Sequence, residues 1–321
     1  AAVVGVTASA LAGGDWDAVL GDFDRVVVDE ASQMTVPLGL GAASYGRRLI
    51  VIGDDRQLPP VVRAPGGATD EWPDLSVSLF ELVRGCLASG PAPGAALERQ
   101  FRMSDGVGAA PAAVWYDGRL RPGTPAVAAR ALAVSPKWEQ HPMAAALDPA
   151  RPVAAVSVAG AARARTNDAE ARWVADWVAA LDACGAGPGR PGGPSLAVIS
   201  PYRAQVARIR RELGVRFPER RALWQASVDT VDRFQGSEAD VVVVSCCPPP
   251  APSDHLADER RLNVALTRAR CKLVLLGDQV RLEAYPVVRR LFAEYEARWP
   301  GAAWRVDAAP DGGAPRGHAG A

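Results

Sequence analysis

Short runs of apolar residues alternate along this chain with segments whose apolar side chains recur at helical spacing. In one such segment, Ala171, Val174 and Val178 lie three or four positions apart. The apolar runs predict strands over residues 2–6, 25–29, 49–53, 153–158, 196–200, 241–246 and 273–277. Helices are expected over residues 168–181, 203–213, 258–269 and 280–298, the last broken or bent at Pro286. Strands that alternate with helices predict an α/β protein with mostly parallel sheets and helices on both faces.

Two stretches rich in glycine and proline interrupt this pattern. Residues 89–94 (SGPAPG) are typical of a linker, and residues 185–194 (GAGPGRPGGP) are typical of a flexible loop. We therefore expect a first α/β domain over residues 1–94 and a second over residues 95–300. The first is expected to be truncated at its N-terminus, because the chain opens inside a predicted strand and without methionine. A disordered tail is expected over residues 301–321.

Composition narrows the class of protein. The 321 residues include 36 basic and 36 acidic side chains, so the formal net charge is zero. This balance gives no overall indication of nucleic-acid binding, but it is compatible with a local basic surface. No apolar run approaches the length of a membrane span and no secretory signal opens the chain, so we expect a cytoplasmic protein without a membrane partner. We also expect it to be monomeric.

The cysteine, histidine and lysine residues do not indicate a metal site or a disulfide framework. The five cysteines and three histidines show no metal-ligand spacing, so we expect buried reduced thiols rather than a zinc site or disulfides. Lys137 and Lys272 are the only lysines, and the other basic residues are arginines. That usage is typical of coding bias in a GC-rich genome, so the arginines are not interpreted one by one.

Asp29 and Glu30 follow the apolar run Val-Val-Val directly. In open α/β sheets, ligands bind at the carboxyl ends of the strands. There, Asp29 is suited to hold Mg²⁺ through water, and Glu30 to orient or deprotonate an attacking water. An acidic loop that caps a helix N-terminus is an equally good interpretation of this pair alone.

A second apolar run ends in Gly53-Asp54-Asp55-Arg56-Gln57-Leu58-Pro59-Pro60. The amide of Gln57 is able to hydrogen-bond a phosphate oxygen and a water together, so it is a candidate sensor of a terminal phosphate. A turn that is stopped by proline explains Pro59 and Pro60 but not Gln57.

Three further segments lie in the second domain: LERQFRM at 97–103 with two arginines, VDTVDRFQGSE at 228–238 before the apolar strand 241–246, and the arginine-rich RRLNVALTRAR at 260–270. Guanidinium groups suit phosphate oxygens and stabilise the charge that develops in phosphoryl transfer. For several arginines, however, a solvated or salt-bridged surface is the preferred interpretation: Arg99, Arg203, Arg208, Arg210, Arg211, Arg260, Arg261 and Arg270.

Six segments in this order, DEASQ, GDDRQLPP, LERQFRM, ISPYRAQ, VDTVDRFQGSEAD and LNVALTRAR, resemble conserved motifs of the superfamily 1B helicases. They match motifs II, III and IV, the ISPYRAQ segment, and motifs V and VI of the branch that contains the nonsense-mediated-decay helicase and its DNA-processing relatives. The resemblance extends to about residue 295. It implies two RecA-like α/β domains, ATP and Mg²⁺ as cofactors, and single-stranded DNA or RNA as partner.

The resemblance also implies roles for individual residues. Asp29 would hold Mg²⁺ and Glu30 would activate the water, while Gln57 would sense the γ-phosphate. The expected nucleotide contacts from the second domain are the arginine fingers Arg102 and Arg268 together with Gly236 and Glu238. The expected nucleic-acid contacts are Thr7, Pro201, Tyr202 and Thr230. For Tyr202, a partly buried aromatic at a strand end is an equally good interpretation.

One motif of that family does not occur here. A helicase needs a P-loop, GxxxxGK[ST], to cradle the phosphates, and neither Lys137 nor Lys272 lies in such a context. We therefore expect the chain to be the C-terminal part of an ATP-dependent helicase or translocase, and to hydrolyse no ATP by itself. The alternative is a non-catalytic relic without a P-loop that binds nucleic acid or a protein partner. A translocase that does not separate strands would share every motif.

Overall fold

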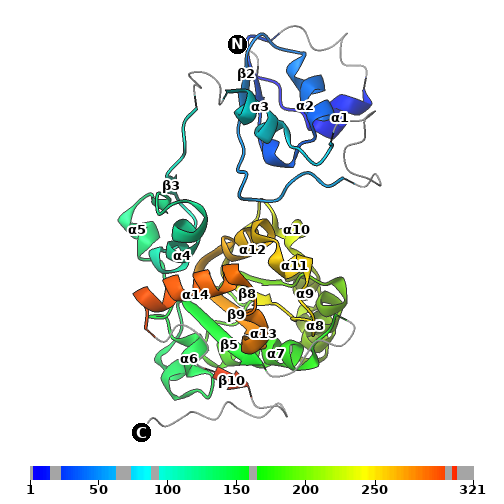
Figure 1. The fold of residues 1–321 in the computed structure, drawn as a ribbon. Helices are drawn as coiled ribbons and strands as arrows, with labels where there is room; N and C mark the ends of the chain where they lie inside the picture. The colour runs from blue at the N-terminus through cyan, green and yellow to red at the C-terminus, as the bar shows by residue number, and fades with distance from the viewer. Residues whose placement is uncertain are drawn as a thin grey trace. The chain divides into compact units, whose positions relative to one another are not determined.

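The computed structural model describes residues 3–14, 23–62, 74–87, 94–158, 165–300 and 306–308. The chain divides into two compact units, Ala1–Ala96 and Leu97–Ala321 (Figure 1). In the described part of the chain, no helix combines the length and apolar character that crossing a membrane requires.

The first unit is built around a pair of parallel strands, in which Val27 lies opposite Ile50. Its elements are α1 (Ala8–Gly13), β1 (Val26–Val28), the 3₁₀ turn η1 (Ala31–Gln33), α2 (Val36–Ala43), β2 (Leu49–Val51) and α3 (Leu79–Leu87). One face of the strands packs on α2 and α3 through a small core that includes Val28 and Leu79. Gly39 lets α2 approach α3, since a Cβ atom there would lie 2.6 Å from a methyl group of Leu79.

The second unit contains a six-stranded sheet in the order β10-β5-β9-β8-β6-β7, with every pairing parallel. Its strands are β5 (Val153–Val158), β6 (Leu196–Ile199), β7 (Val228–Asp229), β8 (Ala239–Ser245), β9 (Ala269–Gly277) and β10 (Val306–Ala308). The central strands are buried on both faces, which explains their continuous apolar sequences. A separate parallel pair joins β3 (Arg99–Gln100) to β4 (Arg121–Pro122).

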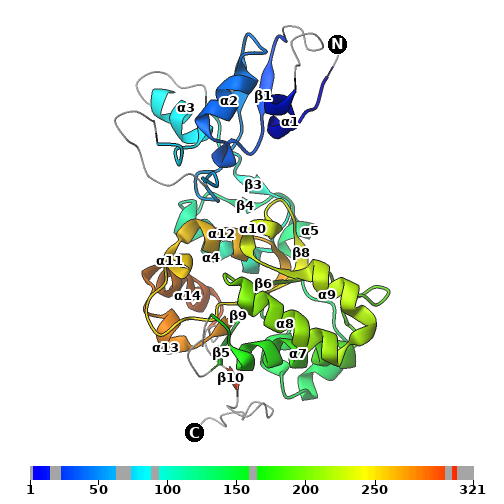
Figure 2. The same cartoon turned by 90° about the vertical axis from the view of Figure 1, so that its right-hand side faces the viewer.

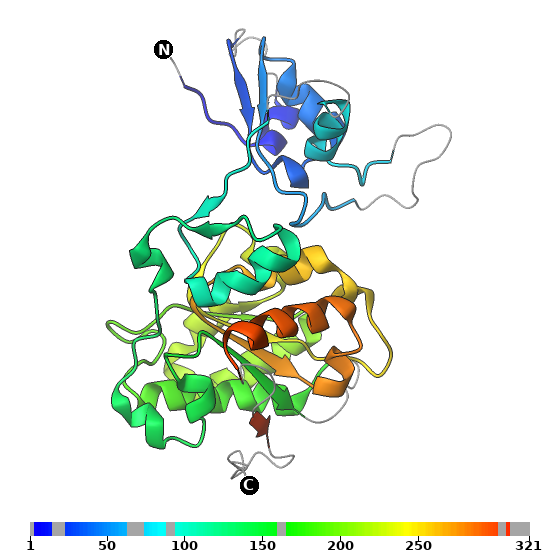
Figure 3. The same ribbon diagram turned by 60° about the vertical axis from the view of Figure 1, so that its left-hand side comes forward.

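Helices cover both faces of this sheet (Figures 2 and 3). The first layer is α7 (Asp168–Ala183), α8 (Arg203–Arg216) and α9 (Arg221–Ser227), and the second is α4 (Asp105–Trp115), α12 (Glu259–Leu266) and α14 (Pro286–Arg298). Shorter elements complete the unit: α5 (Pro125–Ala128), η2 (Pro136–Gln140), α6 (Ala144–Leu147), η3 (Pro218–Arg220), α10 (Val231–Phe234), α11 (Asp254–Ala257) and α13 (Gln279–Leu282). Trp177 and Trp224 are fully buried between the first layer and the sheet. The predicted α/β class with mostly parallel sheets is confirmed.

Two predicted elements are wrong in detail. Residues 3–6 form no strand, and Val3 is 97% exposed, because no neighbouring strand pairs with this segment. The helix predicted over residues 258–269 ends at Leu266, and Ala269 already begins β9. The predicted break at Pro286 is confirmed, because α13 ends at Leu282 and Pro286 occupies the first turn of α14.

Residues 89–93 of the predicted linker, and residues 301–305 and 309–321 of the predicted tail, lie outside the described residues. Within the predicted tail, residues 306–308 form β10 beside β5. The predicted loop at residues 185–194 is a succession of turns in which Gly185, Gly189 and Gly192 adopt positive φ.

Candidate active site

The acidic pair of the first unit lies where β1 ends. Asp29 and Glu30 are both exposed, and Asp29 Oδ1 accepts a hydrogen bond from Glu30 N at 2.9 Å. Glu30 has φ 53° and ψ 34°, a left-handed conformation that costs free energy for a residue with a Cβ atom. It precedes the turn η1, yet its side chain makes no capping hydrogen bond there. The interpretation of Glu30 as a helix cap is therefore not supported.

The carboxylate of Glu30 is held by an amide from the same loop. Gln33 Nε2 donates to Glu30 Oε2 at 2.7 Å, and Gln33 N donates to Glu30 O at 2.9 Å. Neither of these hydrogen bonds uses the second carboxylate oxygen of Glu30, and Glu30 is exposed at the end of the strand. A carboxylate oriented in this way is suited to accept a proton from a water molecule.

The loop after β2 lies directly beside the acidic pair. Ala31 N donates to Ile52 O at 2.9 Å, and a Cβ atom on Gly53 would lie 3.0 Å from Ser32 N. Glycine at position 53 therefore permits the close approach of the two loops. In the second loop, Gln57 Nε2 donates to Asp54 Oδ2 at 2.7 Å, so Asp54 holds the amide of Gln57 in place. The structure thus brings Asp29, Glu30 and Gln57 to one edge of the first unit.

In the second unit, Arg102 joins three segments that lie far apart in sequence. Its Nε atom donates to Glu238 Oε2 at 3.0 Å, and its Nη1 atom donates to Thr267 O at 3.2 Å. The Arg102 and Glu238 side chains remain 31% and 46% exposed, so both are accessible to a ligand. Arg270 approaches the other oxygen of Glu238 at 3.6 Å and pairs with Asp240 at 3.1 Å. The expected nucleotide contacts Arg102 and Glu238 therefore lie side by side.

Gly236 precedes Glu238 in an exposed turn. Its φ is +77°, and a Cβ atom there would meet nothing within 4 Å. The backbone conformation, rather than lack of space, is thus the reason for glycine at this position.

Arg268, the second expected finger, is buried in the second unit at 2% exposure. Its guanidinium donates to Val264 O at 2.9 Å, to Ser237 O at 3.4 Å and to Thr267 Oγ1 at 3.1 Å. In this arrangement, Arg268 stabilises the loop that leads into β9 and is not presented at the surface.

The expected nucleic-acid contacts are distributed between the two units. In the first unit, Thr7 is exposed and caps α1, accepting a hydrogen bond from Ala10 N at 3.2 Å. In the second unit, Pro201 is half-buried, while Thr230 is buried at 8% exposure. The structure therefore leaves only some of these residues accessible.

Tyr202 is 5% exposed and sits in a small cluster with Cys247. Its hydroxyl donates to Ser253 Oγ at 2.8 Å, and its ring lies 5.7 Å from the ring of His255, edge to face. The guanidinium of Arg165 lies 5.9 Å from the Tyr202 ring centre. Burial raises the pKa of the Tyr202 phenol above its usual value. This environment favours the interpretation of Tyr202 as a buried aromatic at a strand end.

Comparison with known proteins decides the family. A profile described as AAA domain matches residues 75–280, and a second profile with the same description matches residues 1–65. The chain belongs to the AAA domain family. Because its curated relatives are helicases, the predicted resemblance to the superfamily 1B helicases is confirmed.

Three relatives of this AAA domain illustrate the similarity. DNA replication ATP-dependent helicase/nuclease JHS1 of Arabidopsis thaliana is 29% identical over 282 residues, which are 84% of this chain and 20% of the relative. DNA replication ATP-dependent helicase/nuclease DNA2 of Mus musculus is 30% identical over 86% of this chain and 26% of the relative. Helicase SEN1 of Saccharomyces cerevisiae is 30% identical over 92% of this chain and 13% of the relative. The chain thus spans about a quarter or less of each relative's length.

Sequence reasoning missed three residues that hold the site of this AAA domain together. Gln33 orients Glu30, Asp54 orients Gln57, and Gln100 Oε1 accepts hydrogen bonds from the backbone N of Arg102 and of Met103 at 2.8 and 2.7 Å. A signal was present in the first two cases, since each amide lies three positions after a carboxylate that ends or follows a strand. For Gln100 there was no such signal beyond its position two residues before Arg102.

The donor set of the acidic loop is compatible with Mg²⁺. Asp29 is exposed and accepts one hydrogen bond through Oδ1. Magnesium typically takes one or two carboxylates and completes its shell with water and phosphate oxygens. Across the described ranges, no three or more side chains of His, Cys, Asp and Glu are grouped closely enough to bind a metal by themselves.

Proposed function

We propose that this AAA domain is part of an ATP-dependent helicase or translocase that moves along single-stranded DNA or RNA. The observation that carries the proposal is the convergence of Arg102, Glu238 and the loop at Thr267, which come from three of the segments that resemble helicase motifs. The names of the curated relatives support the same activity.

In the first unit, we assign the hydrolytic chemistry to the acidic loop. Asp29 would hold Mg²⁺ through water, and the ion would neutralise charge on the phosphates of ATP when it is bound. Glu30 would accept the proton of the attacking water through its exposed carboxylate, with its orientation fixed by Gln33. Gln57, held by Asp54, would hydrogen-bond the terminal phosphate.

In the second unit, we assign charge stabilisation to Arg102, whose guanidinium is partly exposed. Glu238 would accept hydrogen bonds from the nucleotide sugar, and Gly236 would allow the turn that presents it. For Arg268 to act as a second finger, its side chain must leave the carbonyl oxygens that hold it here. Arg268 is therefore proposed to act only after a rearrangement of this loop.

Nucleic-acid binding is proposed for exposed Thr7 in the first unit and for half-buried Pro201 in the second. In the second unit, the buried residues Tyr202 and Thr230 would support the segment around Pro201. Backbone contacts of this kind are sequence-independent and weaken with salt. A monomeric, cytoplasmic protein remains our expectation.

The 321-residue chain by itself is proposed to be inactive in ATP hydrolysis, because it contains no GxxxxGK[ST] segment. The test compares this chain with the full-length protein in an ATPase assay with and without single-stranded DNA and RNA. We expect stimulated hydrolysis by the full-length protein that is lost in Glu30→Gln, with nucleic-acid binding retained. Hydrolysis by the chain alone that is lost in Glu30→Gln would overturn the proposal of inactivity.

The same experiment separates the alternatives. A full-length protein that binds nucleic acid but hydrolyses no ATP under any condition would favour a non-catalytic binding protein. A strand-displacement assay on a partial duplex then distinguishes a helicase from a translocase that moves without separating strands.

A further inference from the structure

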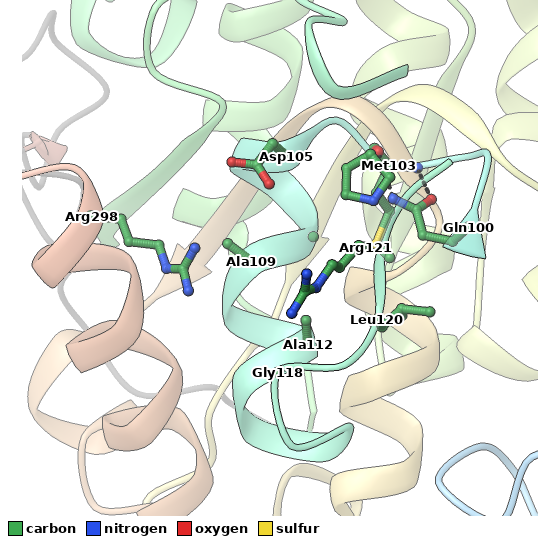
Figure 4. A pocket seen from close by; sticks show the side chains of 11 residues that line it. Gln100, Met103, Asp105, Ala109, Ala112, Gly118, Leu120, Arg121 and Arg298 are labelled. Atoms are coloured by element: carbon green, nitrogen blue, oxygen red, sulfur yellow. Dashed lines mark hydrogen bonds between the residues drawn. The ribbon is translucent and has the colours of Figure 1, made fainter. Parts of the chain in front are cut away.

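The second unit contains a pocket of about 290 Å³ beside α4 that the proposed function does not use (Figure 4). Its walls come from α4, from the segment around β3 and β4, and from the last residue of α14. The residues that line it are Gln100, Met103, Asp105, Gly108, Ala109, Ala112, Gly118, Leu120, Arg121, Pro122 and Arg298.

Small side chains on one helix face create the hollow. Asp105, Gly108, Ala109 and Ala112 lie at positions i, i+3, i+4 and i+7 of α4 and therefore share one face. Ala109 and Ala112 are each 6% exposed, so they form the floor. Larger side chains at these positions would fill the space.

Two arginines border this floor. In Figure 4, Arg298 extends from α14 toward α4, and Arg121 lies on the other side of Ala109, near Ala112. Both residues are exposed, and within the described part of the chain neither side chain makes an ion pair or a hydrogen bond. This differs from many arginines of the same unit, such as Arg208 and Arg261, which pair with carboxylates.

The charges of the lining favour an anion. Asp105 is the one carboxylate that lines the pocket, so two guanidinium groups and one carboxylate leave a formal charge of +1. A group that binds both arginines in spite of the nearby Asp105 carboxylate needs concentrated negative charge and several acceptor oxygens. A phosphate meets both requirements, and guanidinium forks bind its oxygens in pairs.

We propose that this pocket is a binding site for a phosphate group, held between Arg121 and Arg298 over the floor of Ala109 and Ala112. Its volume is near the lower limit of small-molecule sites, about 300 Å³, which accommodates a phosphate with a small attached group. The phosphate belongs either to a free phosphorylated compound or to the backbone of a nucleic acid. Both sources present the same oxygens to the two arginines.

The test uses two probes on the 321-residue chain. Calorimetry measures binding of inorganic pyrophosphate, and fluorescence anisotropy measures binding of a labelled single-stranded oligothymidylate. The variant Arg121→Gln/Arg298→Gln removes both cations, and Ala109→Leu fills the pocket without a change of charge. Arg119→Gln is the matched control, since Arg119 is exposed in the same segment but pairs with Asp117 outside the lining.

We expect the affinity for at least one probe to fall about tenfold for each arginine removed, the size of one charge-assisted hydrogen-bonded contact. Ala109→Leu should reproduce the loss, and Arg119→Gln should not. Loss for pyrophosphate identifies a free phosphorylated compound as the source, whereas loss for the oligonucleotide alone identifies a nucleic-acid backbone.

A variant of the proposed nucleotide site distinguishes pyrophosphate binding in the pocket from pyrophosphate binding at the nucleotide site. Arg102→Gln should leave the affinity of the pocket for pyrophosphate unchanged. The proposal is overturned if wild type binds neither probe, or if the double variant binds both probes as wild type does. Thermal unfolding of every variant, including Ala109→Leu at its buried position, checks that the substitutions leave the fold unchanged.

Discussion

Arg102 Nε lies 3.0 Å from Glu238 Oε2, although 136 positions separate the two residues in sequence. The pair joins the segment at β3 to the turn before β8, and Arg270 approaches the same carboxylate from β9. Neither side chain is fully buried, so the pair contributes modestly to stability. In the proposed function, the pair would present a cation and a carboxylate to the nucleotide.

Arg102→Ala is predicted to lower kcat for ATP hydrolysis by the full-length protein by roughly 10³-fold, the scale of an arginine finger. The matched control is Arg99→Ala, an exposed arginine three positions earlier, in β3, which should hydrolyse ATP at the wild-type rate. Steady-state kinetics measure both. Equal losses in the two variants would show that general positive charge, rather than Arg102, is what matters.

Glu238→Gln should act differently, because this carboxylate is proposed to contact the sugar and not the reacting phosphate. We expect KM for ATP to rise about tenfold with kcat changed much less, the signature of a lost ground-state contact. Kinetics with ATP and with its 2′-deoxy analogue measure this. A variant that lowers kcat and leaves KM unchanged would contradict the assignment.

Gln33→Ala removes the 2.7 Å hydrogen bond to Glu30 Oε2 without touching the carboxylate itself. We predict a fall in kcat of about tenfold to a hundredfold, since a misplaced general base loses much of its advantage. Gln33→Glu should be worse than Gln33→Ala, because it places a second carboxylate beside the first. Wild-type kcat in both variants would mean that Glu30 orients itself without this amide.

Much of the fold could be predicted because buried parallel strands have continuous apolar sequences. The strand at residues 153–158 matches its prediction at both ends, since its residues are buried on both faces. The same reasoning failed at residues 3–6, where apolar residues have no neighbouring strand to pair with. It also failed at Ala269, because the arginine-rich sequence continues across the end of α12 without a turn residue.

The candidate site was only partly predictable. Strand ends located Asp29, Glu30 and Gln57, since ligands bind at that edge of a parallel sheet. The contact between Arg102 and Glu238 depends on how distant segments pack, so no local spacing indicates it. The burial of Arg268 is unexpected from composition as well, because arginine is rarely buried unless its donors find acceptors, as they do here in carbonyl oxygens.

The chain's two lysines provide a matched pair for a stability prediction. Lys272 is fully buried on β9, where Nζ donates to Asp148 O at 3.1 Å and to Arg151 O at 2.6 Å. Lys272→Met should lower the free energy of unfolding by about 3 kcal/mol, because two carbonyl oxygens lose their donor. Lys137→Met changes an exposed residue and should stay within about 0.5 kcal/mol. Urea denaturation of both variants measures the difference, and equal effects would contradict this assignment.

Glu170 predicts how stability depends on pH. It is fully buried at the start of α7, where Oε2 accepts hydrogen bonds from Ser245 Oγ at 2.6 Å and Cys247 N at 3.0 Å. Burial raises its pKa from 4.5 to about 8, with a smaller contribution from the charge of Asp278. Between pH 4.5 and 8, the folded protein therefore binds a proton that the unfolded chain has lost.

The sign follows from proton linkage. This carboxyl contributes stability that is complete below pH 4.5 and is lost as the pH rises toward 8, with a slope of up to about 1.4 kcal/mol per pH unit. Glu170→Gln keeps an acceptor oxygen for Ser245 and Cys247 but cannot ionise, so the variant should lose this slope. Urea denaturation of both proteins from pH 5 to 7.5 measures the difference. If the free energies of unfolding of wild type and Glu170→Gln change in parallel across that range, Glu170 is already ionised in the folded protein and the prediction is wrong.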